Sequence, residues 1–407
     1  MTALAPRRRR NTLLALAAGV VTAVAAPTLL FVGAKAISNS TAGRNALANV
    51  PPEQSFPQTP TTMLATVSDS NELTSVTVFV MAPEAAGATA YDQRGGSVVS
   101  VPINIDPGSG EQLLSLHDAY ALGGQDELLI DVQSALNLTI DSGAVMNRKE
   151  FAGFLLGLPP IQVSFVRDVL SADGSVLFAK GAATLSATQV AQVMTTRSPT
   201  EHERLRRPNL EALWAGIAKA VGTGRQGQTL ATSVPTTFAD TAARLMAGPV
   251  ASRGLLTRAL DASKNPEQLD VEALDRPDTI LVFASIAPAS MTKPATGLSF
   301  RIEAPPGYDQ QVRKTISILL ASAGNVVSVD LNAAPKAETT FFIYDPTVAA
   351  AEPTDNPVFG TITIQTPKVR LGGVDETISL GTDYLDHVDL SAPDATSTSL
   401  QSTETTG

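Results

Sequence analysis

The sequence contains no cysteine and only three histidines, His117, His202 and His387. The absence of cysteine excludes disulfides, zinc sites built on thiolates and thiol nucleophiles. The histidines lie far apart and lack the spacing of a helical zinc motif, so the pattern favours surface or hydrogen-bonded side chains over a metal site.

Positive charge is also scarce. The formal net charge is −10 and the isoelectric point is near 4.9, so the chain has no overall basic field that would attract nucleic acid. Basic residues gather in two places only, at 7–10 and between 197 and 207. We therefore expect no nucleic-acid partner.

What the chain does have is the size and composition of a folded protein with more than one domain. Its 407 residues are 43% hydrophobic and 17% charged, which is typical of globular proteins. Single cores usually stop growing at roughly 250–300 residues, so two or three domains are expected.

The N-terminus has the pattern of a membrane anchor. Four arginines at 7–10 precede the uncharged apolar stretch 11–34, which at about 1.5 Å per residue can cross the ~30 Å core of a bilayer. The positive-inside rule then predicts that residues 1–10 are cytoplasmic and that the body lies outside the membrane. A cleaved signal peptide ending at "AVA" (23–25) is the alternative, but the apolar run continues past that point and favours an uncleaved anchor.

The rest of the chain divides by composition into a spacer, two folded regions and a tail. Residues 35–62 are rich in Ser, Asn, Pro and Thr and are expected to be a spacer. Alternating strand and helix patterns predict α/β domains over 63–288 and 298–388. The Ser/Thr-rich tail 389–407 is predicted to be disordered.

Individual elements are predicted from hydrophobic periodicity. In the first region we expect strands at 62–68, 74–82, 95–105 and 278–288, and helices at 126–137, 208–221 and 237–260. Pro208 is expected in the first turn of its helix. In the second region we expect a helix at 309–324 and strands at 298–305, 325–332, 339–345, 360–367 and 376–385.

Four arginines cluster in "RSPTEHERLRRPNLEALW" (197–214), namely Arg197, Arg204, Arg206 and Arg207. On a helix, Arg204 and Arg207 lie on one face and can hold two oxygens of a phosphate or pyrophosphate. The alternative is a salt-bridged surface, because Glu201, Glu203 and Glu211 are close enough in sequence to neutralise the cluster.

Several motifs follow one another in the order "SVVSVPINI" (97–105), "LHDAYALGG" (116–124), "GAATLSATQVAQVMTTR" (181–197) and "EHERLRRP" (201–208). With the membrane anchor and spacer, this order resembles the LytR-CpsA-Psr family of cell-envelope proteins. The resemblance implies an α/β domain with a central mixed sheet flanked by helices. It also implies transfer of anionic glycopolymers from a polyprenyl-pyrophosphate carrier to peptidoglycan with magnesium, arginines and acidic residues.

Some residues of the family pattern are present. Tyr120, Gly123 and Gly124 match its small-residue and aromatic turn. The resemblance also implies phosphate binding by three arginines of the cluster, Arg197, Arg204 and Arg207, with Glu201 at the family's acidic position.

The family's catalytic signature is not preserved. Its Ser-x-Pro-Arg-Asp segment aligns with Ser100, Pro102, Ile103 and Asn104, so an arginine and an acidic residue are missing. The segment "LTSVT" (73–77) lacks the family's magnesium-binding aspartate. These departures predict a relative that binds a polyprenyl (pyro)phosphate or an anionic glycopolymer without transferring it and without a cofactor. The alternative is an active magnesium-dependent phosphotransferase that recruits Arg94 or Arg167.

The end of the chain resembles the LytR C-terminal domain. The match runs through 301–330 and closes on Leu380, Gly381, Asp383 and Tyr384, in a two-domain order common in actinobacterial relatives. We interpret this region as a binding module for envelope polymer or protein, with a purely structural cap as the alternative.

Two apolar features are compatible either with a lipid-binding groove or with packing in the hydrophobic core. The stretch 151–166 can line a groove for a polyprenyl tail, but an apolar helix followed by a strand is more often core. Trp214 is likewise expected to be a packing residue.

Overall fold

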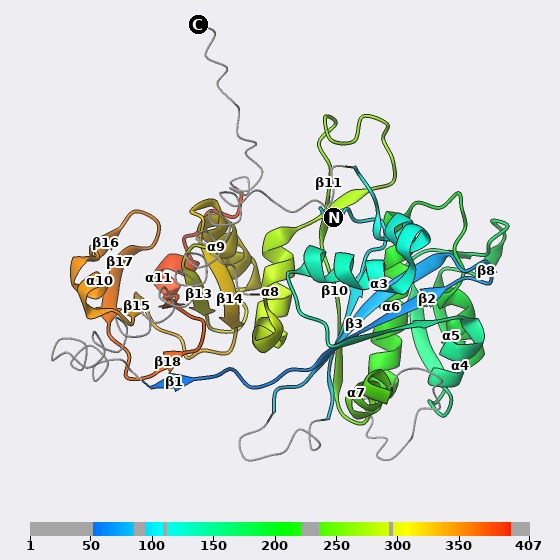
Figure 1. Cartoon of the computed structure of the whole chain (residues 1–407), viewed down its shortest axis with the longest axis horizontal. Helices are drawn as coiled ribbons and strands as arrows, with labels where there is room; N and C mark the ends of the chain where they lie inside the picture. The colour runs from blue at the N-terminus through cyan, green and yellow to red at the C-terminus, as the bar shows by residue number, and fades with distance from the viewer. Residues whose placement is uncertain (1–51, 85–93, 109–111, 222–235, 293–295, 392–407) are drawn as a thin grey trace, which may run out of the picture. The chain divides into compact units, whose positions relative to one another are not determined.

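The computed structural model describes residues 52–84, 94–108, 112–221, 236–292 and 296–391 (Figure 1). They fall into two compact units. In the small unit, which holds residues 52–53 and 367–370, the Arg370 amide donates to the Pro52 carbonyl over 2.9 Å. The other unit contains all remaining described residues.

The predicted cytoplasmic segment 1–10, the predicted anchor 11–34 and residues 392–407 of the predicted tail lie outside the described residues. Across the part of the chain that the structure describes, no helix has both the length and the apolar character needed to cross a bilayer. The predicted spacer 35–62 is not free of strands, because β1 (Glu53–Gln54) lies in it and β2 begins at Thr61.

A five-stranded mixed sheet forms the centre of the first region. Its order is β10-β4-β3-β2-β5, and all strands except β3 run parallel to one another. The strands are β2 (Thr61–Val67), β3 (Leu73–Met81), β4 (Gly96–Val101), β5 (Ser142–Met146) and β10 (Val250–Gly254). Three of the predicted strands are thus confirmed as β2, β3 and β4.

Helices cover both faces of this sheet, as the α/β prediction required. They are α3 (Leu116–Leu136), α4 (Arg148–Phe154), α5 (Ala187–Met194), α6 (Glu203–Val221), α7 (Thr236–Met246) and α8 (Arg276–Ile286). Alternate residues of a strand point to opposite faces. Val78 and Val80 accordingly join the core with α3 and α8, whereas Phe79 and Met81 join the core with α4 to α7. Because both faces are buried, β2 and β3 are apolar or small along their whole length.

Smaller antiparallel pairs surround the sheet. β6 (Ile161–Phe165) pairs with β9 (Gly181–Leu185), and β7 (Val169–Leu170) pairs with β8 (Val176–Phe178). β11 (Thr257–Ala259) pairs with β12 (Glu272–Leu274).

The second region contains a six-stranded mixed sheet in the order β14-β13-β19-β15-β17-β16. The strands are β13 (Ser299–Glu303), β14 (Asn325–Asp330), β15 (Thr339–Ile343), β16 (Asp355–Asn356), β17 (Gly360–Gln365) and β19 (Glu376–Ser379). The helices are α9 (Asp309–Ala321), α10 (Pro346–Ala351) and α11 (Thr382–Leu385). The predicted strand 376–385 is therefore a short strand followed by a helical turn.

Three sequence predictions in the first region are wrong. Residues 278–286 of the predicted strand 278–288 belong to helix α8, because Asp275 caps its N-terminus and Pro277 occupies its first turn. The predicted helix 237–260 ends at Met246, and strand β10 follows. The segment 116–124, likened to a turn, is the first half of α3, which bends at Gly124 (φ +67°).

The core interpretations of 151–166 and Trp214 are confirmed. Trp214 is only 1% exposed, and its ring centroid lies 5.6 Å from that of Phe79 and 6.1 Å from that of Phe151. Phe154 and Phe165 are buried in the same cluster. Edge-to-face and stacked aromatic pairs of this kind fill the space beneath α6.

Gly216 allows α6 to lie directly on β6, since a Cβ at this position would sit 2.6 Å from the backbone carbonyl oxygen of Gln162. Gly216→Ala should therefore lower the free energy of unfolding by about 1–3 kcal/mol, as overpacking does. The matched control is Gly153→Ala in α4, where a Cβ meets nothing within 4 Å. That variant should gain about 0.5–1 kcal/mol. Urea titration checks both, and equal effects of the two substitutions would contradict the packing argument.

Candidate functional site

The candidate site lies at the carboxyl edge of the parallel strands of the first sheet. In open α/β sheets, ligands bind in the crevice outside the carboxyl ends of the strands. The segment after β4, which carries Ile103 and Asn104, lies at this edge. The first turn of α6 reaches the same edge, because Arg206 donates to the carbonyl oxygen of Thr74 at the start of β3. The structure thus brings the signature segment and the arginine cluster to one side of the sheet.

Arg206, which the sequence argument did not select as a ligand-binding residue, is the most buried arginine of the cluster at 5% exposure. Its guanidinium donates to three backbone carbonyls, those of Thr74 (2.7 Å), Thr196 (3.2 Å) and Met194 (3.3 Å). It also pairs with Glu203 over 3.2 Å. With its donors used in this way, Arg206 fixes the site and does not bind a ligand.

Glu203 is buried beside Arg206 at the first position of α6. Burial raises the pKa of this carboxyl, and the opposing attraction of Arg206 and Arg197 does not overcome that effect. The Glu203 amide donates to the Asp270 carboxylate over 2.9 Å, which gives the helix a cap from a distant part of the chain. For this reason α6 begins five residues before Pro208, and Arg204, Arg206 and Arg207 lie in its first turns instead of preceding it.

Arg207 is held between two carboxylates. Its Nη1 donates to Thr257 Oγ1 (2.9 Å) and lies 3.5 Å from Glu272 Oε2, while its Nε is 3.9 Å from Glu211 Oε1. Gly254 makes room for this arrangement, because a Cβ there would lie 2.3 Å from Glu211 Oε1. Arg207 therefore makes the ion pairs that the salt-bridge alternative predicts.

Arg204 and Arg197 differ from Arg207 in having unused donors. Arg204 is exposed and makes no hydrogen bond or ion pair with any described residue. Arg197 is half-buried, and its Nε is buried without a hydrogen-bond partner among the described residues. These two guanidinium groups are the cations of the predicted site that remain available to an anion.

The signature segment is buried and uncharged. Ile103 is 1% exposed and Asn104 is 2% exposed. Both side-chain polar atoms of Asn104 lack a partner in the described part of the chain, as does the Ser100 hydroxyl. The Asn104 carbonyl accepts from the Glu272 amide over 2.9 Å, which places Asn104 next to the residue that holds Arg207.

Of the two arginines of the active-transferase alternative, Arg94 lies away from this edge, whereas the charge of Arg167 acts on Glu201 in the arginine-cluster segment. Arg94 precedes β4, so the length of that strand, about 3.3 Å per residue, separates it from the carboxyl edge. Arg167 is exposed just after β6, and its backbone is bound by the Asn209 side chain of α6 (3.1 and 3.3 Å). Arg94 therefore cannot replace the missing signature arginine, and Arg167 lies along α6.

No protein-family model matches the chain, and no curated protein matches it. Similar solved structures include TagT bound to LIIa-WTA, which is 18% identical over 55% of this chain and 88% of that chain, with a TM-score of 0.40. TagT of B. subtilis is 17% identical over 53% of this chain and 84% of its own, with a TM-score of 0.37.

A third similar structure is the LytR-CPS2A-psr family protein YwtF (TagT) with bound octaprenyl pyrophosphate lipid. It is 18% identical over 55% of this chain and 86% of its own, with a TM-score of 0.37.

The environment of Arg206 predicts a large stability difference between two neighbouring arginines. Arg206→Met leaves Glu203 buried without its partner and three carbonyls without a donor, so the free energy of unfolding should fall by about 3–5 kcal/mol. Arg204→Met removes an exposed side chain and should stay within about 0.5 kcal/mol of the wild type. Chemical denaturation of both variants measures this, and a mild effect at Arg206 would show that the pair is not structural.

Proposed function

We propose that this chain is a LytR-CpsA-Psr-type cell-envelope protein that binds a polyprenyl-(pyro)phosphate-linked or anionic glycopolymer and does not transfer it. The order and spacing of its motifs over 97–208 support the family assignment. The proposal includes the uncleaved anchor at 11–34, a body outside the membrane, and a LytR C-terminal-like domain at 298–388.

The observation that carries the loss of transferase activity is the chemistry at Ile103 and Asn104. Phosphoryl transfer depends on positioned cations that neutralise the developing charge. A buried isoleucine and a neutral amide supply none at the two positions where the family has an arginine and an acid.

The residues at the place of the family's magnesium-binding aspartate do not fit magnesium either. Magnesium is usually bound through one or two carboxylates in octahedral geometry. At the place of the family's aspartate the chain has Thr74, Ser75 and Thr77, all buried, and the Thr74 and Ser75 hydroxyls bond to Thr66. Among the described residues, no group of three or more acidic, histidine or cysteine side chains is placed to hold a metal ion.

The anion is proposed to contact Arg197 and Arg204, whose donors are unused. Arg207 would have to exchange Glu272 or Glu211 for the anion, so its contribution is smaller. Each charge-assisted hydrogen bond contributes about 1.5–3 kcal/mol, and exposure and salt reduce that value.

The loss of catalysis is tested with the full-length chain in detergent, undecaprenyl pyrophosphate and magnesium. Phosphate release should not exceed the rate without protein, because no cation or magnesium ligand stands at the signature positions. Release that disappears on chelation would overturn this part of the proposal and favour the active phosphotransferase.

Anion binding is tested by titrating the full-length chain with undecaprenyl phosphate. The double variant Arg197→Ala, Arg204→Ala should bind at least roughly tenfold more weakly, which corresponds to ~1.4 kcal/mol. The control is Arg276→Ala, which removes one arginine charge from an exposed position in α8 and should bind like the wild type. If the double variant binds as tightly as this control, Arg197 and Arg204 do not bind the anion and the proposed binding function is wrong.

A further inference from the structure

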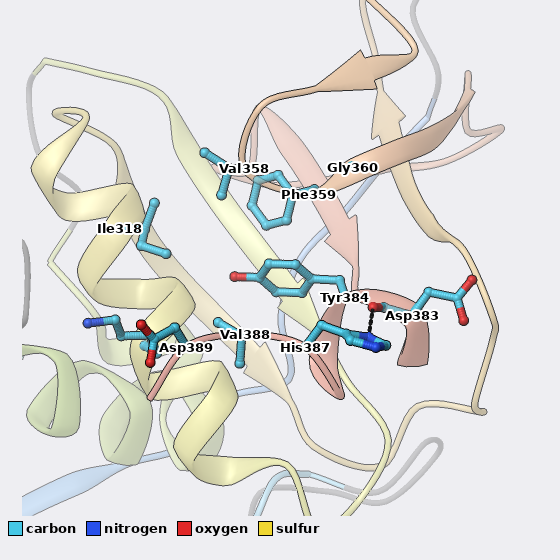
Figure 2. Close-up of a pocket in the computed structure, with 10 residues that line it drawn as sticks. Ile318, Val358, Phe359, Gly360, Asp383, Tyr384, His387, Val388 and Asp389 are labelled. Carbon is cyan, nitrogen blue, oxygen red and sulfur yellow. Dashed lines mark hydrogen bonds between the residues drawn. The ribbon is translucent and has the colours of Figure 1, made fainter. Parts of the chain in front are cut away.

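A pocket of about 590 Å³ opens in the second region, away from the arginines (Figure 2). Its walls come from three places: Ile318 on α9, Val358 and Phe359 before β17, and Tyr384 and Val388 in and after α11. The volume falls within the roughly 300–1,000 Å³ that is usual for small-molecule sites. The residues named above make the walls mainly apolar, and two of them, Phe359 and Tyr384, contribute aromatic rings.

The aromatic part of the wall is held rigidly. The ring centroids of Phe359 and Tyr384 are 5.0 Å apart, and Phe359 packs edge-on against Phe341 at 5.3 Å. The Tyr384 hydroxyl lies 3.0 Å from Thr315 Oγ1 on α9. Burial raises the pKa of Tyr384, despite the opposing hydrogen bond, so its ring stays neutral. A ligand meets a wall that is already formed and loses little entropy by ordering it.

The rim of the pocket offers one uncommitted hydrogen-bonding atom. His387 Nδ1 lies 2.8 Å from the Asp383 carbonyl oxygen and donates to it, as the dashed line in Figure 2 shows. In the neutral ring this bond leaves Nε2 as an acceptor. Within the described residues Nε2 has no partner, and His387 itself is exposed.

The charges around the pocket argue against an anionic ligand. One lysine, Lys314, stands against two aspartates, Asp383 and Asp389, in a chain of net charge −10. The Asp383 carboxylate points away from the pocket in Figure 2. A phosphate or carboxylate would therefore meet no net positive field here, unlike at the arginines of the first region.

We propose that this pocket binds a neutral saccharide ring. Such a ring has an apolar C–H face that can lie against Phe359, Tyr384 and the aliphatic walls, because C–H groups are attracted to the negative face of an aromatic ring. Its hydroxyls reach the rim, where one donates to His387 Nε2. A purely apolar ligand would cover this rim without pairing its polar atoms, which costs free energy.

The inference goes beyond the proposed function, which concerns phosphate at Arg197 and Arg204. A sugar ring carries no phosphate, so the two sites use different residues and different chemistry. The double variant Arg197→Ala, Arg204→Ala should bind saccharide like the wild type, and failure of one proposal leaves the other standing.

The test uses the full-length chain in sugar-free detergent micelles with three probes: chitotriose, cellotriose and mannotriose. Saturation-transfer NMR should detect binding of at least one of them. Phe359→Leu keeps an apolar side chain but removes the aromatic face, and should weaken binding at least roughly fivefold. His387→Ala should weaken binding roughly three- to tenfold through the lost hydrogen bond, and its exposed position keeps the fold intact.

The matched control is Phe342→Leu, the same substitution on β15, where the ring packs against Lys336 outside the pocket. It should bind like the wild type. The proposal is wrong if none of the three saccharides binds, or if His387→Ala and Phe359→Leu bind as tightly as the control. Binding of an apolar peptide such as Leu-Phe-Leu in place of any saccharide would also overturn it and identify a protein docking site.

Discussion

The buried pair of Glu203 and Arg206 is the interaction on which the rest of the candidate site depends. Removing two charges from water costs several kcal/mol per ion, and only good geometry and additional hydrogen bonds offset that cost. Arg206 meets this condition by donating to carbonyls at the end of α5, in the following loop and at the start of β3. One side chain thereby joins two helices to the carboxyl edge of the sheet. The same bonds occupy the guanidinium that would otherwise be the most enclosed anion ligand of the cluster.

Two glycines, Gly216 and Gly254, allow α6 to approach its neighbours closely, and this sets the position of α6 and of Arg207. Gly216 lets the helix lie against the backbone of β6, and Gly254 leaves space for the Glu211 carboxylate. Arg207 is then placed between Glu211 and Glu272, and Glu272 is bonded through its backbone to Asn104. The edge of the sheet where a transferase would gather positive charge is here internally neutralised. The cations that remain available among the described residues of the cluster are Arg197 and Arg204.

Sequence periodicity predicted the α/β class, three strands of the first sheet and most strands of the second sheet. It failed where a local pattern fits two structures. The segment 278–288 contains the apolar run 280–284. A fully buried strand and a fully buried helix look alike in such a run. The capping residue Asp275 and Pro277 were the signals that favour the helix. The predicted helix 237–260 failed because β10 takes its place beside β4, and the pairing strand lies about 150 residues earlier in the chain.

The sequence by itself determined that the chain has no thiol chemistry, that four arginines gather between 197 and 207, and that Ile103 and Asn104 stand where the family that it resembles has charged residues. These properties depend on residue identity alone. Only the tertiary structure decided which arginine is buried, which is neutralised and which is available. Arg206 bonds to Thr74, 132 residues away, and Arg207 to Glu272, 65 residues away. Such partners are chosen by the packing of distant elements, because a hydrogen bond depends on distance in space and not on spacing along the chain.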